Sequence, residues 1–501
     1  MRTPRLLAAV VAAVAMAALV PAAHSAAQTT ARPKKVVVLG IDGLLFDKIA
    51  PADAPHLDAL IASGRSSKTW LYANPMAPTM SGPGWATIAT GVWPDKHKVT
   101  SNNWGTTTNF AQYPDFLTRL ENANPALSTY AITDWSPLTT DSAGRAIFAG
   151  AIDKRENVDD SIGVPQADAI VAGRAAAYLK DNGPDASFVY FDAVDAAGHS
   201  CGAASSCYTT AINETDKNLG KVLDAVKARA TYADEDWTFL VTTDHGHTDA
   251  GGHGGSTPPE RSSFIIQTGP GIPAGTMAVK PKNVDIAATV LNLFGVGAPL
   301  DGQVLGTPAA DPFESVTLNS RVDESGIPAS VLGWTKSVPS GWSIDNSAMG
   351  TGGVTEWRGW SLTTDEFWTR TQPDQQRETN VRARGVFAVA DSDEWSDKLV
   401  NGSFTSSLMS PRYPVTGKTK ATITFGSHYL KEGAETATLA VSFDGGAFQT
   451  VLTYPGDVLA KVESVRVSVP SGAAGMVVRW RLADGSNNWY WAVDNPGVTL
   501  S

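Results

Sequence analysis

The sequence predicts an α/β protein with a mostly parallel central sheet flanked by helices, followed by an all-β sandwich of the jelly-roll type. In the first part, short apolar runs without polar alternation are typical of strands buried on both faces. These runs alternate with segments whose apolar residues recur at helical spacing, as in α/β folds. After residue 313 the runs instead show period-two alternation or β-branched residues, which favours an antiparallel β fold.

Each predicted element rests on a local pattern. The buried strands are expected at 36–41 (VVVLGI), 187–191 (SFVYF), 239–242 (FLVT) and 264–267 (FIIQ). Helices are expected at 167–180, 212–227 and 285–294. The β runs of the second part are 419–425, 437–443, 464–469 and 476–482, with a hairpin turn at 444–446.

The chain has 501 residues, which is enough for two or three domains. A stretch rich in Gly, Pro and Ala at 306–312 is expected to be a linker. We therefore predict an α/β catalytic domain at 33–308 and a β-sandwich accessory domain at 313–501.

The N-terminal residues 1–27 have the pattern of a signal peptide. Two arginines precede an apolar run at 6–20, and small residues follow it. A membrane anchor would need about 20 apolar residues, so we expect secretion and no transmembrane segment. Cys201 and Cys207 are the two cysteines of the chain, and in an exported protein we expect them to form a disulfide.

The overall charge is acidic, because 39 Lys and Arg stand against 50 Asp and Glu, a formal net charge of −11. This balance argues against a general nucleic-acid binder. An anionic substrate would need positive charge supplied locally.

Three motifs rich in Asp and His each follow a predicted strand: GIDG at 40–43, DAVDAAGH at 192–199, and TDHGH at 243–247 with GGHGG at 251–255. Each motif alone is weak, since an Asp at a strand end is usually a helix cap or a turn residue. Their combination is more specific, because strand ends of a parallel sheet converge and carboxylates with neutral imidazoles bind metal ions. The sequence therefore predicts a metal site.

A candidate nucleophile lies between the first two motifs, in the segment 77–91 (APTMSGPGWATIATG), where a helix is expected to begin near Trp85. Ser81 or Thr79 would then lie near a helix N-terminus, which suits a phosphate. Either hydroxyl could instead be an ordinary helix cap. A ligand set sized for two metals favours a nucleophilic hydroxyl.

Together these motifs resemble the alkaline phosphatase superfamily, nearest its type I phosphodiesterase/nucleotide pyrophosphatase branch, over roughly residues 33–308. The resemblance implies two divalent metal ions, expected to be Zn²⁺, with Ser81 as the nucleophile. It assigns Asp195, His199 and His253 to one ion and Asp42, Asp244, His245 and Ser81 to the other. Asn102 matches an Asn that follows the nucleophile helix in this family. His247 is the alternative to His253, and His97 is expected to be structural.

The sequence departs from the branch at two positions after the nucleophile. Gly84 and Trp85 stand where Asn and His are usual, so the usual Asn contact to a phosphoryl oxygen is missing. Oxyanion contacts would then come from the metals, the Gly82 N–H or Asn102. A sulfatase is disfavoured because Trp85 replaces the Arg of its motif.

We expect a secreted two-metal phosphoric ester hydrolase that acts on a small phosphate ester through a covalent phospho-Ser81 intermediate. A diester is favoured over a monoester because tryptophans surround Ser81 in the sequence, with Trp85, Trp93 and Trp104 nearby. The cations considered for a monoester are Lys96, Lys98 and Arg261, and phosphomonoesterase activity on the same site is the alternative.

An alternative from another class is an exported glycan- or surface-binding protein with a degenerate hydrolase domain. Nine of the 15 tryptophans lie at 313–501, and a sugar-stacking platform could form from Trp357, Trp360, Trp489 and Trp491. Tryptophans in a sandwich are more often core residues.

Overall fold

The computed structural model describes residues 1, 32–140, 146–277, 280–308 and 310–501. The predicted signal peptide at 1–27 lies outside this description, apart from Met1. Within the described part, no helix is both long enough and apolar enough to cross a membrane.

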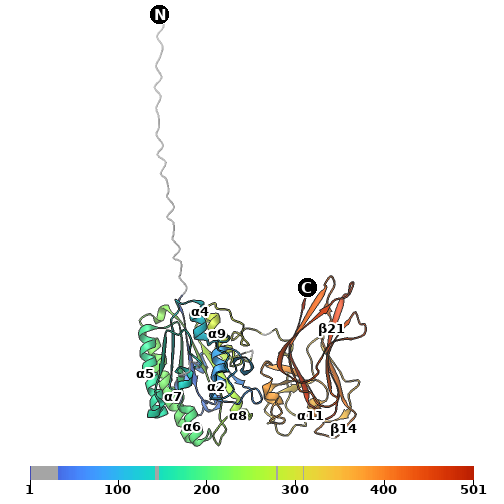
Figure 1. The fold of residues 1–501 in the computed structure, drawn as a ribbon, viewed down its shortest axis with the longest axis horizontal. Coiled ribbons are helices and arrows are strands. Elements are labelled where there is room, and N and C mark those ends of the chain that lie inside the picture. The colour runs from blue at the N-terminus through green and yellow to red at the C-terminus, as the bar shows by residue number, and fades with distance from the viewer. Residues whose placement is uncertain (2–31, 141–145, 278–279, 309) are drawn as a thin grey trace. The chain divides into compact units, whose positions relative to one another are not determined.

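The first part of the chain is built on an eight-stranded mixed sheet with the strand order β4-β3-β5-β1-β6-β7-β2-β8 (Figure 1). The strands are β1 (Lys34–Ile41), β2 (Arg65–Trp70), β3 (Thr129–Thr133), β4 (Lys154–Asn157), β5 (Ala186–Phe191), β6 (Asp236–Thr242), β7 (Ser262–Thr268) and β8 (Gly275–Thr276). Strand β1 lies at the centre and pairs in parallel with β5 and β6. Strand β7 runs antiparallel to both β6 and β2, so the sheet is mostly but not wholly parallel.

The central strand is apolar from Val36 onward because both faces of the sheet are covered by helices. Val37 and Leu39 pack with α1 (Pro55–Ser63), α5 (Val164–Asn182) and α7 (Ser206–Lys227). Val36 and Val38 pack with α2 (Ser81–Thr90), α4 (Phe116–Ala123) and α9 (Asp285–Leu293). Figure 1 shows α5 and α7 on one side of the sheet and α2, α4 and α9 on the other. The predicted α/β class is confirmed.

The second part consists of antiparallel β-sheets, as predicted. One six-stranded sheet contains β10 (Ser343–Asp345), β15 (Phe404–Met409), β16 (Tyr413–Pro414), β18 (Thr436–Phe443), β19 (Gln449–Thr453) and β21 (Gly475–Gly485). The other contains β9 (Trp334–Thr335), β12 (Ser361–Thr364), β13 (Val386–Asp391), β17 (Lys420–Tyr429), β20 (Val458–Ser468) and β22 (Tyr490–Leu500). The strands β11 (Thr351–Gly352) and β14 (Val400–Asn401) form a separate two-stranded sheet.

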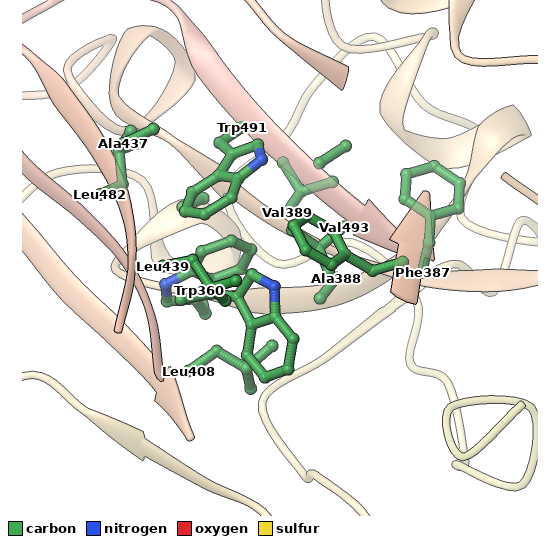
Figure 2. Close-up of a cluster of buried hydrophobic side chains, with 14 of the residues drawn as sticks. Trp360, Phe387, Ala388, Val389, Leu408, Ala437, Leu439, Leu482, Trp491 and Val493 are labelled. Atoms are coloured by element: carbon green, nitrogen blue, oxygen red, sulfur yellow. The ribbon is translucent and has the colours of Figure 1, made fainter. Parts of the chain in front are cut away.

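The two six-stranded sheets share one hydrophobic core, in which eight of the buried residues described are tryptophans. Figure 2 shows Trp360 and Trp491 enclosed by aliphatic side chains such as Leu439. Trp357, Trp360 and Trp491 are fully buried, and Trp489 is partly buried. The sugar-stacking platform considered for these residues is therefore wrong, because their rings stabilise the fold instead of facing solvent.

Ion pairs join the two parts, and residues 33–501 form one compact unit. Arg261 of α8 (Pro258–Arg261) donates two hydrogen bonds to Asp365, and Arg384 pairs with Asp285 at 2.7 Å. The domain division at 308–313 stays a prediction.

A disulfide joins Cys201, the last residue of α6 (Ala193–Cys201), to Cys207 near the start of α7. The predicted pairing is confirmed. It fastens the end of the short helix α6, which carries two of the candidate metal ligands, to a long helix packed on the sheet.

Candidate metal centre

The three predicted motifs meet at the carboxyl-terminal ends of neighbouring strands β5, β1 and β6. Asp42 follows β1, and Asp244 and His245 follow β6. Asp195 lies in the first turn of α6, directly after β5, and His199 is one turn further along the same face. Because adjacent parallel strands end at one edge of the sheet, residues some 200 positions apart in sequence become neighbours.

These side chains form two groups whose ligand atoms lie within 4.8 Å of one another: Asp195, His199, His247 and His253 in one, and Asp42, Asp244 and His245 in the other. All ligands assigned from the resemblance are thus brought together. His247, considered only as an alternative to His253, joins the first group as well. Its Nε2 lies 2.7 Å from Asp195 Oδ1, closer than the 3.6 Å of His253 Nε2.

His247 reaches this place because a neighbouring glycine leaves space for its ring. A Cβ at Gly198, on helix α6, would lie 2.6 Å from His247 Nε2. In the second motif, His199 is therefore a candidate ligand, and Gly198 leaves the space for another candidate ligand, His247. The sequence contained this signal, but only the fold shows which imidazole needs the space.

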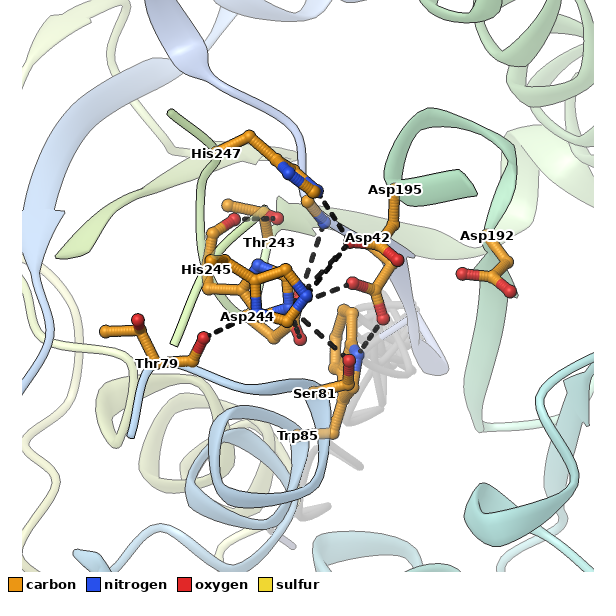
Figure 3. Close-up of polar contacts among 12 residues, drawn as sticks. Asp42, Thr79, Ser81, Trp85, Asp192, Asp195, Thr243, Asp244, His245 and His247 are labelled. Atoms are coloured by element: carbon orange, nitrogen blue, oxygen red, sulfur yellow. Dashed lines mark hydrogen bonds and ion pairs between the residues drawn. The ribbon is translucent and has the colours of Figure 1, made fainter. Parts of the chain in front are cut away.

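Ser81 is the first residue of α2, so the helix begins four residues earlier than the predicted start near Trp85. Its Oγ lies 3.4 Å from His245 Nε2, which itself lies 3.4 Å from Asp42 Oδ1 (Figure 3). The candidate nucleophile is therefore at the edge of the second group of ligands.

Asn102 lies beside the same helix start, as expected from the resemblance. Its Oδ1 accepts a hydrogen bond of 2.7 Å from the Gly82 N–H. The suggestion that this N–H contacts a phosphoryl oxygen is therefore wrong, because the N–H is already used. The Nδ2 group of Asn102 takes no part in this contact, so it can donate a hydrogen bond to another group.

Two of the three cations considered near Ser81 are engaged away from it, and the third, Lys98, is exposed. Arg261 is buried against Asp365, and Lys96 pairs with Asp301 at 2.6 Å. His97 is buried and contacts Thr87 Oγ1 at 3.0 Å, which fits the structural role predicted for it.

Trp85 and Tyr190, which were not predicted to contact a metal ligand, hold Asp42 in place. Trp85 Nε1 donates a hydrogen bond of 2.8 Å to Asp42 Oδ2 (Figure 3). The Tyr190 hydroxyl donates one of 2.6 Å to the same oxygen. The other oxygen, Oδ1, faces His245 and is buried with no hydrogen-bond donor among the described residues. Trp85 thus orients one carboxylate oxygen toward the ligand group.

The electrostatics of the group fit a bound cation. Burial, and then Asp195, raise the pKa of Asp42 to about 7, and burial with Asp42 beside it raises the pKa of Asp244 well above its usual range. Burial also lowers the pKa of His245 well below its usual range, so its imidazole is neutral. A bound cation would stabilise the ionised form of these crowded, buried carboxylates beside neutral imidazoles.

The first group shows the same fit in its hydrogen bonds. His253 Nδ1 lies 2.7 Å from the Thr79 carbonyl oxygen and donates a hydrogen bond to it. The other ring nitrogen, Nε2, then carries no proton in the neutral imidazole, and its lone pair is available to a metal ion. That Nε2 lies 3.0 Å from His199 Nε2. Burial by itself would raise the pKa of Asp195. The hydrogen bond from His247 and the nearby His245 outweigh this effect of burial and lower the pKa to about 2. An anionic carboxylate facing several ring nitrogens is a donor set typical of zinc sites.

Residues 36–256 match the model of the type I phosphodiesterase / nucleotide pyrophosphatase family. This part of the chain is similar to that family. The phosphodiesterase-family hydrolase assignment and the candidate metal groups support each other, because the match spans all three strand-end motifs.

Two relatives show how distant the known members are. Human ectonucleotide pyrophosphatase/phosphodiesterase family member 7 is 23% identical over 251 residues, covering 48% of this chain and 54% of the human protein. GPI ethanolamine phosphate transferase 2 of Aspergillus fumigatus is 24% identical over 309 residues, covering 56% of this chain and 39% of that protein. The chain thus spans about half or less of the length of these relatives.

Among solved structures, murine ectonucleotide pyrophosphatase/phosphodiesterase 5 is 14% identical, with 54% of this chain and 97% of that one covered and a TM-score of 0.42.

Proposed function

We propose that this protein is an exported, zinc-dependent phosphodiesterase in which Ser81 is the nucleophile. The observation that carries the proposal is the position of Ser81 Oγ, 3.4 Å from His245 Nε2, at the edge of two groups of Asp and His side chains that are mostly buried. One zinc ion would be held by Asp42, Asp244 and His245. The other would be held by Asp195 with the imidazoles of His199, His247 and His253.

The chemistry that two bound zinc ions supply in such sites is activation of a hydroxyl and stabilisation of the departing oxygen. Ser81 Oγ forms a bond to phosphorus while the bond from phosphorus to one ester oxygen breaks. The alcohol leaves with the proton that Ser81 gives up, and phospho-Ser81 remains esterified to the second alcohol. Water then hydrolyses this intermediate, which restores the Ser81 hydroxyl and releases a phosphoric monoester.

Asn102 is proposed to position the phosphoryl group. Its Oδ1 is held by the Gly82 N–H, so the side chain is fixed at the start of α2 beside Ser81. Its Nδ2 can donate to a non-bridging phosphoryl oxygen, replacing the Asn that the family carries where this chain has Gly84.

A diester is favoured over a monoester by charge. A monoester brings an additional negative charge, which such sites usually meet with Arg or Lys. Of the three cations considered for a monoester, Arg261 and Lys96 are paired with carboxylates elsewhere and Lys98 is exposed. One negative charge on the substrate therefore matches this site better than two.

The test compares hydrolysis of bis-p-nitrophenyl phosphate and p-nitrophenyl phosphate by the zinc-loaded protein. We expect faster turnover of the first, loss of both activities in Ser81→Ala with zinc content unchanged, and retained turnover in Ser81→Thr. Faster monoester hydrolysis would overturn the substrate class. A near-normal rate in Ser81→Ala, or full activity after complete removal of metal, would overturn the mechanism.

Export is proposed from the signal-peptide pattern at 1–27, and the Cys201–Cys207 disulfide supports it because such bonds persist in oxidising compartments. N-terminal sequencing of the protein recovered from outside the cell should find a chain that starts near residue 28. Recovery of the uncleaved chain from the cytoplasm alone would contradict this.

A further inference from the structure

A second cavity, of about 440 Å³, lies away from the metal groups, between strand β2 and the start of the β part of the chain. None of the residues assigned to the metal site or to Ser81 is among its described lining residues. Its walls are largely apolar and include Phe46, Trp70, Leu318, Leu332 and Phe387. A cavity of this volume is in the range of small-molecule sites.

Lys282 is a buried charge that faces this cavity. Its side chain lines the cavity although the residue is only 5% exposed. Within the described parts of the chain, its ammonium makes no direct hydrogen bond or ion pair, although the charges of Asp365 and Asp494 act to raise its pKa. Burial lowers the pKa of Lys282 to about 8, so its ammonium group is still mostly protonated at neutral pH.

The carboxylates that also line the cavity already have partners. Asp365 accepts hydrogen bonds of 2.9 and 3.0 Å from Arg261, and Glu366 pairs with Arg370 at 3.2 Å. Glu314 accepts a hydrogen bond from the Val386 N–H at 3.1 Å. Lys282 is therefore the buried cation of this cavity whose ammonium has no direct partner among the described residues, whereas Lys280, which also lines the cavity, is exposed.

A buried ammonium without a direct hydrogen-bond partner is unfavourable, and a ligand that supplies one negative charge would offset this cost. The three carboxylates in the lining would repel a dianion such as a phosphate monoester. Lys68 is already paired and Lys280 is exposed, so apolar walls next to the one buried ammonium suit a monoanionic head with a short hydrocarbon chain.

We propose that this cavity binds a small amphipathic carboxylate, with the carboxylate on Lys282 and the hydrocarbon chain against Phe46, Leu318 and Leu332. The site is separate from the phosphodiesterase centre and does not depend on that proposal.

The test measures binding of octanoate and of 1-octanol to the full chain by isothermal titration calorimetry at pH 7. Octanoate should bind at least about 10-fold more tightly than octanol, because only the acid can form a charge-assisted hydrogen bond with Lys282. Equal affinities, or no binding of octanoate, would overturn the proposal without the need for any variant.

Variants at two lysines then locate the site. Lys282→Met should weaken octanoate binding by about 10-fold or more and leave octanol unaffected, whereas Lys282→Arg should retain octanoate binding. Lys68→Met is the matched control, because Lys68 also lines the cavity but already pairs with Asp47. Unchanged octanoate affinity in Lys282→Met would overturn the assignment. Rates with bis-p-nitrophenyl phosphate, measured in parallel, report on the metal site separately.

Discussion

Replacement of Trp85 by Phe tests whether the hydrogen bond to Asp42 is needed for metal binding. Trp85 is fully buried, and its Nε1 donates to Asp42 Oδ2 at 2.8 Å. Phe keeps an aromatic ring but lacks the N–H, and Asp42 Oδ2 then retains only the Tyr190 hydroxyl as donor. A hydrogen bond to a charged group contributes about 1.5–3 kcal/mol, and each 1.4 kcal/mol is about tenfold in affinity.

We therefore expect the affinity for the zinc ion held by Asp42, Asp244 and His245 to fall about 10- to 100-fold in Trp85→Phe, as is typical when an outer hydrogen-bond partner of a ligand is lost. The assay is competition for zinc with a chromophoric chelator, which yields the affinity and the number of ions per chain. Diester hydrolysis should fall in parallel once free zinc drops below the new dissociation constant.

The control is Trp93→Phe, which removes the same atoms from another tryptophan that is 1% exposed. Trp93 packs edge-on against Tyr72 and not against Asp42. Both variants lose some packing energy, so only the difference between them reports on the hydrogen bond. Wild-type zinc affinity in Trp85→Phe, or an equal loss in both variants, would refute the argument.

Two further predictions concern Gly84 and Asp134. A Cβ at Gly84 would lie 2.7 Å from Asp244 Cβ and 2.8 Å from its carbonyl oxygen, so Gly84→Ala should displace this ligand, reduce zinc content and destabilise the fold by about 1–3 kcal/mol in urea unfolding. Gly173→Ala, in open space on α5, is the control and should gain up to about 1 kcal/mol; equal behaviour of the two would count against close packing at Gly84. Burial, with Asp168 beside it, raises the pKa of Asp134 from 3.8 to about 11, so the folded chain keeps a proton that the unfolded chain releases, and stability falls as pH rises between these values. Asp134→Asn should flatten this dependence in urea unfolding at pH 5, 7 and 9, and parallel curves for the two proteins would contradict the reasoning.

The sequence alone predicted four of the eight strands of the central sheet, β1, β5, β6 and β7, and the Asp and His residues placed at the ends of β1, β5 and β6. The run VVVLGI is apolar at every position because both faces of β1 are covered, and this pattern is visible without a structure. Since parallel strands end at a common edge, the Asp and His residues that follow them were expected to meet, and Asp42, Asp195 and Asp244 do.

The tertiary structure decided what depends on packing between distant segments. The space at Gly198 brings His247 beside Asp195, and the indole N–H of Trp85 reaches Asp42 across the helix–sheet contact. Composition suggested that the tryptophans after residue 313 could form a surface, but burial between two sheets makes them core. Local periodicity reveals which face of an element is apolar, whereas a contact between side chains requires knowing which faces of distant elements lie together.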